Sequence, residues 1–130
     1  MRKYRALSVL LAAVVVTACA SEVKRQSVEL TVSMPEFGQR YELRKDVSFL
    51  LDSGYSRTIP AGTEFAAAGR LPQGLVLRTT QTVLTVEGAH VHEAYAVLGG
   101  DQLVGFYLPV EKAYSALPVA TPFPLVERKQ

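Results

Sequence analysis

The chain contains no tryptophan, and Cys19 is its only cysteine. A single thiol excludes a disulfide within the chain, and it excludes a metal site built from several cysteine ligands. Basic and acidic residues are nearly balanced, with 14 Lys and Arg against 12 Asp and Glu. Because a nucleic-acid-binding surface needs clustered cations, we expect no nucleic-acid partner. The fold must therefore depend on its hydrophobic core.

The first nineteen residues have the order of an export signal. An apolar stretch over residues 6–16, interrupted only by Ser8, follows three cations. These cations are Arg2, Lys3 and Arg5. A membrane span needs roughly 20 apolar residues, so this stretch is too short to cross a bilayer but is typical of a signal peptide. We expect the protein to be exported.

The apolar stretch ends in Val16-Thr17-Ala18-Cys19, which resembles the lipobox of bacterial lipoproteins: an aliphatic residue, two small residues and a cysteine. The resemblance implies that residues 1–18 are removed and that the Cys19 thiol carries a diacylglycerol. The new amino group is usually acylated too, for example with palmitate, and no other cofactor is expected. The alternative is an ordinary secretory signal cleaved near Ala20, which would discard Cys19.

The implied lipid also implies a location. One acyl chain binds a membrane only marginally, whereas two or three chains make attachment effectively irreversible, so the membrane is an expected partner. The residue after Cys19 is Ala20 and not Asp. In Gram-negative lipoproteins this difference implies sorting to the outer membrane. We therefore expect an outer-membrane lipoprotein that faces the periplasm, with the inner membrane as the alternative.

Removal of the leader changes the bulk properties. Loss of Arg2, Lys3 and Arg5 with the leader leaves 11 of the 14 cations against 12 anions, a formal charge of −1. The 130 residues less 18 leave 112, enough for one domain that buries roughly two thirds of its unfolded surface. We divide them into a lipidated flexible tether (19–27), a β domain (28–117) and a Pro-rich extended tail (118–130). The tail is expected to lie across its own domain, or alternatively to project toward a partner.

Short strands are predicted throughout the domain. Alternating apolar and polar residues predict a half-buried strand over residues 28–34. Six further strand-like segments are separated by turn residues, and they are 41–51, 63–69, 75–79, 82–86, 89–98 and 103–108. Gly99-Gly100-Asp101 is the strongest hairpin signal. We predict an all-β fold, a small antiparallel barrel or sandwich of about five to seven short strands.

Two motifs resemble those of small bacterial β-barrels of the Src-homology-3 type. Pro60-Ala61-Gly62-Thr63 precedes a strand, and Gly105-Phe106-Tyr107-Leu108-Pro109 ends one, with Tyr114 soon after. The resemblance implies a short helical turn at residues 111–114 that carries this tyrosine. The acidic loop and paired tryptophans of the peptide-binding members are missing, so the resemblance implies a fold and not a ligand.

His90 and His92 are the candidate metal ligands. Residues i and i+2 of a strand project from one face, so two imidazoles could hold one ion. However, Zn²⁺ takes three or four ligands, and Glu93 would point to the other face. We therefore favour no metal site, and we expect both histidines to be solvated on an outward face, with Val91, Tyr95 and Val97 inward.

Four aromatic residues are the candidates for contact with a partner: Tyr95, Phe106, Tyr107 and Tyr114. Phe106 and Tyr107 fall on opposite faces of a strand, and only one of these rings can enter a single core. The other ring would enlarge an exposed apolar patch, and such patches mark contact sites. The alternative is that one ring belongs to the core and the other is an ordinary surface residue covered by the tail.

No catalytic constellation is evident in the sequence. Ser53-Gly54 is not part of a G-x-S-x-G motif. We predict a lipid-anchored binding or assembly module of the cell envelope without catalytic activity, with another envelope protein as its partner. One alternative is a periplasmic binder of a metal or small ligand through His90 and His92. A second is a lipoprotein inhibitor of an envelope-attacking hydrolase, although such inhibitors typically carry a disulfide.

Overall fold

The structure, a computed structural model, describes residues 22–129. Within this range all regular structure is β-strand, in twelve short strands without a helix. Every pair of neighbouring strands is antiparallel. The predicted all-β antiparallel class is confirmed.

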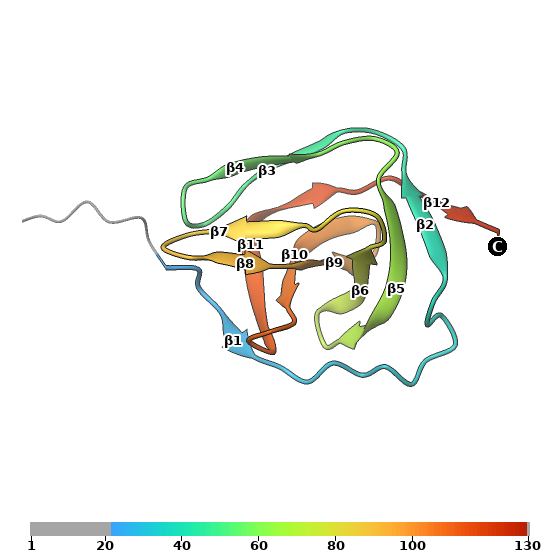
Figure 1. Ribbon diagram of the computed structural model, residues 1–130, viewed down its shortest axis with the longest axis horizontal. Helices are drawn as coiled ribbons and strands as arrows, with labels where there is room; N and C mark the ends of the chain where they lie inside the picture. Colours follow the sequence, from blue (N-terminus) through green and yellow to red (C-terminus); the bar gives the residue numbers. More distant parts are fainter. Residues whose placement is uncertain (1–21, 130) are drawn as a thin grey trace, which may run out of the picture.

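Eight strands form one sheet that curves around the core (Figure 1). In order across the sheet they are β1 (Gln26–Ser27), β11 (Ala113–Pro122), β10 (Gln102–Leu108), β9 (Tyr95–Gly99), β6 (Gly74–Thr79), β5 (Glu64–Leu71), β2 (Arg40–Leu43) and β12 (Leu125–Arg128). The edge strands β1 and β12 do not pair with each other, so the sheet is not a closed barrel.

Two hairpins complete the core. They are β3 (Val47–Leu50) with β4 (Ser56–Ile59), and β7 (Thr85–Glu87) with β8 (Val91–Glu93). Buried side chains from both hairpins join those of the curved sheet in one large apolar cluster. For example, the ring centroids of Phe49 and Phe106 lie 5.3 Å apart. The hairpins therefore cover apolar surface that the open sheet would leave exposed.

A second apolar cluster lies on the other face of the sheet. Its buried members are Leu71, Val76, Val97, Tyr107 and Tyr114. Along β6 and β9, successive residues alternate between the two clusters, as the pleat of a strand requires. The central strands are therefore buried on both faces.

Residues 28–34 do not form the predicted strand. Beyond β1, this segment makes a single bridge, between Thr31 and Arg70, and Val32 is exposed. Val28 and Leu30 instead pack against the second cluster, which accounts for the apolar alternation. The chain passes close to β5 at Gly69, where an added Cβ would lie 2.6 Å from Leu30 Cδ1.

The structure has more strands than predicted because the longer segments are interrupted. Residues 41–51 divide into β2 and β3, which belong to different sheets. Residues 89–98 divide into β8 and β9 at Ala94, whose N–H donates to the carbonyl of Leu84. Both breaks reflect backbone pairing: β2 and β3 pair with different strands, and β8 pairs with β7 whereas β9 pairs with β6 and β10.

The predicted hairpin at Gly99-Gly100-Asp101 is confirmed. Gln102 pairs with Gly99, and Gly100 has a φ of 65°, a conformation that glycine adopts without strain. The helical turn expected at residues 111–114 is not formed, since β11 begins at Ala113 and carries Tyr114. A bulge between Leu103 and Gly105 shifts the register of β10.

The described part of the predicted tail, residues 118–129, lies on its own domain, but mostly as strands of the sheet. β11 continues through Pro122, and β12 pairs with β2. Between them Phe123 is buried, with its ring centroid 5.6 Å from that of Phe65. The sheet therefore extends from β1 to β12, beyond the predicted domain limits at 28 and 117.

Candidate functional site

His92 forms the closest imidazole–carboxylate contact in the described chain. Its Nδ1 donates to Oε1 of Glu111 over 2.6 Å, which joins β8 to the turn between β10 and β11. The side chain of His92 is only 10% exposed. This hydrogen bond holds the pKa of the Glu111 carboxyl below its usual value, against the opposing effect of burial. Such a partner fixes the orientation of the imidazole ring.

His90 lies in a different environment. It belongs to the turn between β7 and β8, where Gly88 donates its N–H to the His90 carbonyl, and it is exposed. The expectation of two solvated histidines on one outward face is therefore wrong for His92. The expectation that Val91 points inward is also wrong, because Val91 is exposed and His92 is the residue of β8 that faces the protein.

Sequence reasoning missed Glu111, since a partner 19 residues away leaves no local signal.

Across residues 22–129, no group of three or more His, Cys, Asp or Glu side chains is arranged to hold a metal ion. The described chain also has no helix that is long and apolar enough to cross a membrane.

The four candidate aromatic residues do not form an exposed patch. Phe106 belongs to the large cluster, whereas Tyr107 and Tyr114 are buried in the second cluster and Tyr95 packs against it. The ring centroids of Tyr95 and Tyr107 lie 6.2 Å apart. The prediction failed because the sheet has a core on each face, so both rings of the Phe106–Tyr107 pair find an apolar environment.

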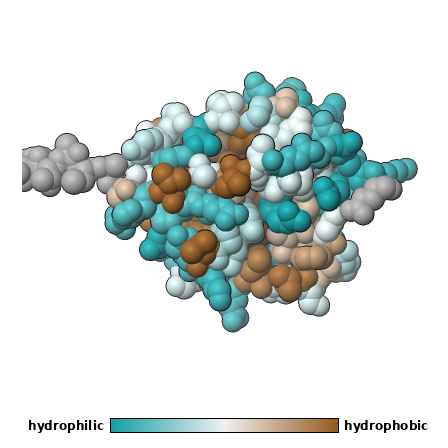
Figure 2. Space-filling view, viewed as in Figure 1, coloured by the Kyte–Doolittle hydropathy of each residue, from teal (hydrophilic) through white to brown (hydrophobic). Residues whose placement is uncertain are grey.

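Exposed apolar side chains lie elsewhere on the molecule. On the face shown in Figure 2 they are mostly separate spots among hydrophilic residues. The exposed large hydrophobic residues include Phe37, Leu50, Tyr55, Val91 and Val126. Scattered residues of this kind are normal on a protein surface, so a contact site needs further evidence.

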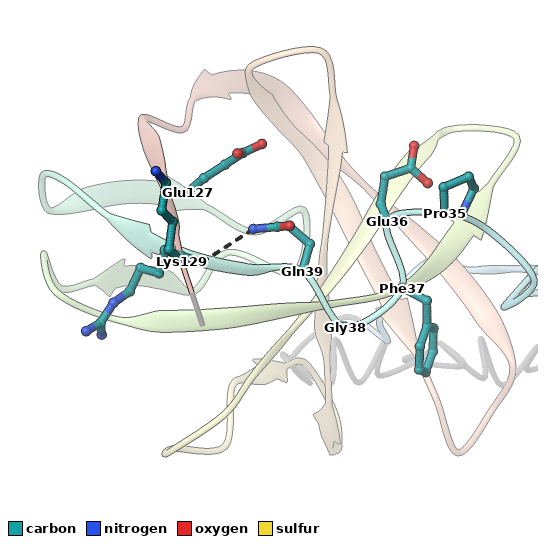
Figure 3. Close-up of a pocket in the computed structure, with 8 residues that line it drawn as sticks. Pro35, Glu36, Phe37, Gly38, Gln39, Glu127 and Lys129 are labelled. Carbon is teal, nitrogen blue, oxygen red and sulfur yellow. Dashed lines mark hydrogen bonds between the residues drawn. The ribbon is translucent and has the colours of Figure 1, made fainter.

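A cleft of about 560 Å³ opens between the loop before β2 and the C-terminal strand β12. Figure 3 shows Glu36 and Phe37 pointing to opposite sides of this loop, while Gln39 reaches toward β12. The Gln39 Nε2 donates to the backbone carbonyl of Arg128 over 3.5 Å. The cleft therefore has an exposed aromatic ring beside a polar wall and an edge strand.

Two of the charged residues that line this cleft, Glu36 and Arg128, form ion pairs with neighbouring residues. Arg70 Nη2 lies 3.0 Å from Glu36 Oε1, and Arg128 contacts both Glu64 and Glu42. A backbone hydrogen bond, followed by the Arg70 guanidinium, lowers the pKa of the Glu36 carboxyl. Because the pairs are accessible to solvent, a polar partner can exchange with them at little cost.

Cys19, the predicted lipidation site, lies outside the described residues. The chain that follows is not a flexible tether as far as Ser27. Val23 is only 8% exposed and belongs to the large cluster, and Gln26–Ser27 pairs with β11 as β1. Lys24 Nζ also lies 3.3 Å from Asp52 Oδ2, in the loop between β3 and β4. The folded domain therefore begins at Val23.

No family model, no curated protein and no solved structure matches this chain.

Proposed function

We propose that the protein is a lipid-anchored binding or assembly module of the cell envelope, without catalytic activity. One observation carries this proposal: the only cysteine of the chain closes the Val16-Thr17-Ala18-Cys19 motif directly after a short apolar stretch. The fold that begins at Val23, four residues later, supports it. A leader that is removed before Cys19 would leave every described strand intact.

The binding role is assigned to the cleft between the loop before β2 and the edge strand β12. An edge strand presents backbone groups to which an extended segment of another envelope protein can add. Phe37 is exposed at the cleft and supplies an aromatic anchor for such a segment. In Figure 1 β12 lies at the end of the molecule opposite to the start of the described chain, so the anchor would leave it accessible.

The anchor is tested by metabolic labelling with a palmitate analogue in a Gram-negative host. We expect the wild-type chain to incorporate the label and to partition into the detergent phase, because Cys19 carries the lipid. Cys19→Ser should abolish both properties, whereas Ser21→Ala, two residues away, should change neither. Recovery of unlabelled wild-type protein from the soluble periplasm would contradict the proposal.

The binding surface is tested by a photo-crosslinking amino acid introduced in living cells at Phe37, or at Val119 as a control position that is also exposed. We expect a defined crosslinked species in the envelope fraction for position 37 and none for position 119. Equal crosslinking at both positions, or none at position 37, would show that the cleft is not the contact surface.

A further inference from the structure

The chain emerges from the domain beside the tips of two hairpins. The described chain begins at the end of the longest axis where the tips of the β3–β4 and β7–β8 hairpins also lie (Figure 1). The Lys24–Asp52 ion pair ties the first described residues to the loop between β3 and β4. Val23 is buried in the large cluster and lines the same small cavity as Asp52 and Ser53 of this loop, which holds the chain in place. The position of the N-terminal segment relative to the tips is therefore determined by the fold.

The two tips are also tied to each other. The Ser53 hydroxyl donates to the backbone carbonyl of Glu87, and Arg57 of β4 contacts the Glu87 carboxylate. Glu87 is paired with Val91 in the β7–β8 hairpin. These contacts make the end of the molecule a single structured surface and not two independent loops.

Three large apolar residues are exposed around these tips. Leu50 is 57% exposed, Tyr55 is 44% exposed and Val91 is 68% exposed. Leu50 and Tyr55 flank the β3–β4 loop, and Val91 opposes Glu87 in the neighbouring hairpin. Tyrosine is enriched where a membrane meets water, because its ring is apolar and its hydroxyl is polar.

The length of chain before Val23 limits how far this surface can lie from a lipid on Cys19. Four residue steps separate Cys19 from Val23, and an extended chain spans at most about 3.6 Å per residue, so the two α-carbons lie within about 14 Å. We propose that the end of the domain formed by the two hairpin tips rests on the lipid surface, with Leu50, Tyr55 and Val91 in the headgroup region. This inference rests on the proposed lipidation of Cys19.

Apolar contact, and not headgroup charge, is the basis of this docking. The residues that tie the tips together carry both signs, with Lys24 and Arg57 facing Asp52 and Glu87. Insertion of a few apolar side chains into the headgroup region is weak by itself but becomes effective once acyl chains hold the protein at the bilayer. The docking would orient β12 and its cleft away from the membrane.

The absence of tryptophan makes the test direct, because one introduced tryptophan is the only one in the chain. The lipidated proteins Tyr55→Trp and Leu50→Trp are compared with Val126→Trp, which places the probe on exposed β12 at the other end. Each is incorporated into vesicles of phosphatidylcholine whose acyl chains carry bromine, a quencher of tryptophan emission. Circular dichroism confirms that each variant is folded, and flotation measures vesicle binding.

We expect Tyr55→Trp and Leu50→Trp to lose most of their emission on brominated vesicles, with a blue shift, and Val126→Trp to lose little. If all three proteins float with the vesicles but none is quenched, the anchor is right and the docking is wrong. Equal quenching of all three would also overturn the docking, since the domain would have no fixed orientation. If the proteins do not float, the proposed lipidation fails and the docking fails with it.

Discussion

At the scale of single residues, the contact between His92 and Glu111 joins two partly buried side chains from different elements. The hydrogen bond lowers the pKa of Glu111, so the folded state favours the ionised carboxylate more than the unfolded chain does. A carboxyl with a lowered folded-state pKa contributes stability above the unfolded value of 4.5 and loses it as pH falls through the folded value. The contact should therefore stabilise the protein at neutral pH.

We expect His92→Ala to lower the free energy of unfolding by about 1–3 kcal/mol at neutral pH, because a hydrogen bond to a charged, partly buried carboxylate is lost. His90→Ala, at an exposed turn position, should change it by less than about 0.5 kcal/mol. Urea unfolding at several pH values measures both. The deficit of His92→Ala should shrink as pH falls through the lowered pKa of Glu111. Equal stability of the two variants at neutral pH would show that the contact contributes nothing.

At the scale of elements, chain segments that look independent in the sequence are held together by tertiary contacts. The segment after β1 crosses the sheet as an extended strap over Tyr107 and Tyr114, although its alternation is that of a strand. At the other end of the chain, β12 adds to β2, and Phe123 anchors the connection against Phe65. Both terminal segments thereby cover apolar side chains of the central strands that would otherwise be exposed to solvent.

The elements also show where the hydrophobic pattern is and is not informative. Strands bounded by turn residues, such as β6 and β10, were predicted within one or two residues. The interruption at Ala94 was not predicted. A backbone hydrogen bond from Ala94 to Leu84 separates β8 from β9 there, without a change in residue composition. Pairing partners of this kind are distant in sequence, and only the folded chain brings them together.

At the scale of the whole molecule, the curved sheet has distinct ends. The hairpin tips and the start of the described chain lie at one end of the longest axis, and β12 lies at the other (Figure 1). The buried Val23 connects the first end to the chain that leads back to Cys19. With the proposed lipid on Cys19, the domain would have little freedom to rotate, because only three residues separate Cys19 from the buried Val23.

This arrangement predicts how the N-terminal boundary affects stability. A chain that begins at Ala20 should fold with full stability, whereas one that begins at Ser27 should lose about 1–3 kcal/mol because the burial of Val23 is removed. Val23→Ala in the longer chain should reproduce much of that loss, and Glu22→Ala, at an exposed position, should not. Urea midpoints measure the four proteins. Equal midpoints for the two starting points would show that residues 20–26 are a tether after all.

Local patterns in the sequence determined the all-β class, the hairpin at residues 99–101 and the expectation that the tail covers its own domain. These features depend on neighbouring residues, since the two-residue period of a strand and the positive φ of Gly100 are local properties. Only the tertiary structure decided that the sheet has a core on each face, that His92 pairs with Glu111 and that Val23 belongs to the core. Each of these depends on contacts between residues far apart in the chain, which composition and periodicity do not specify.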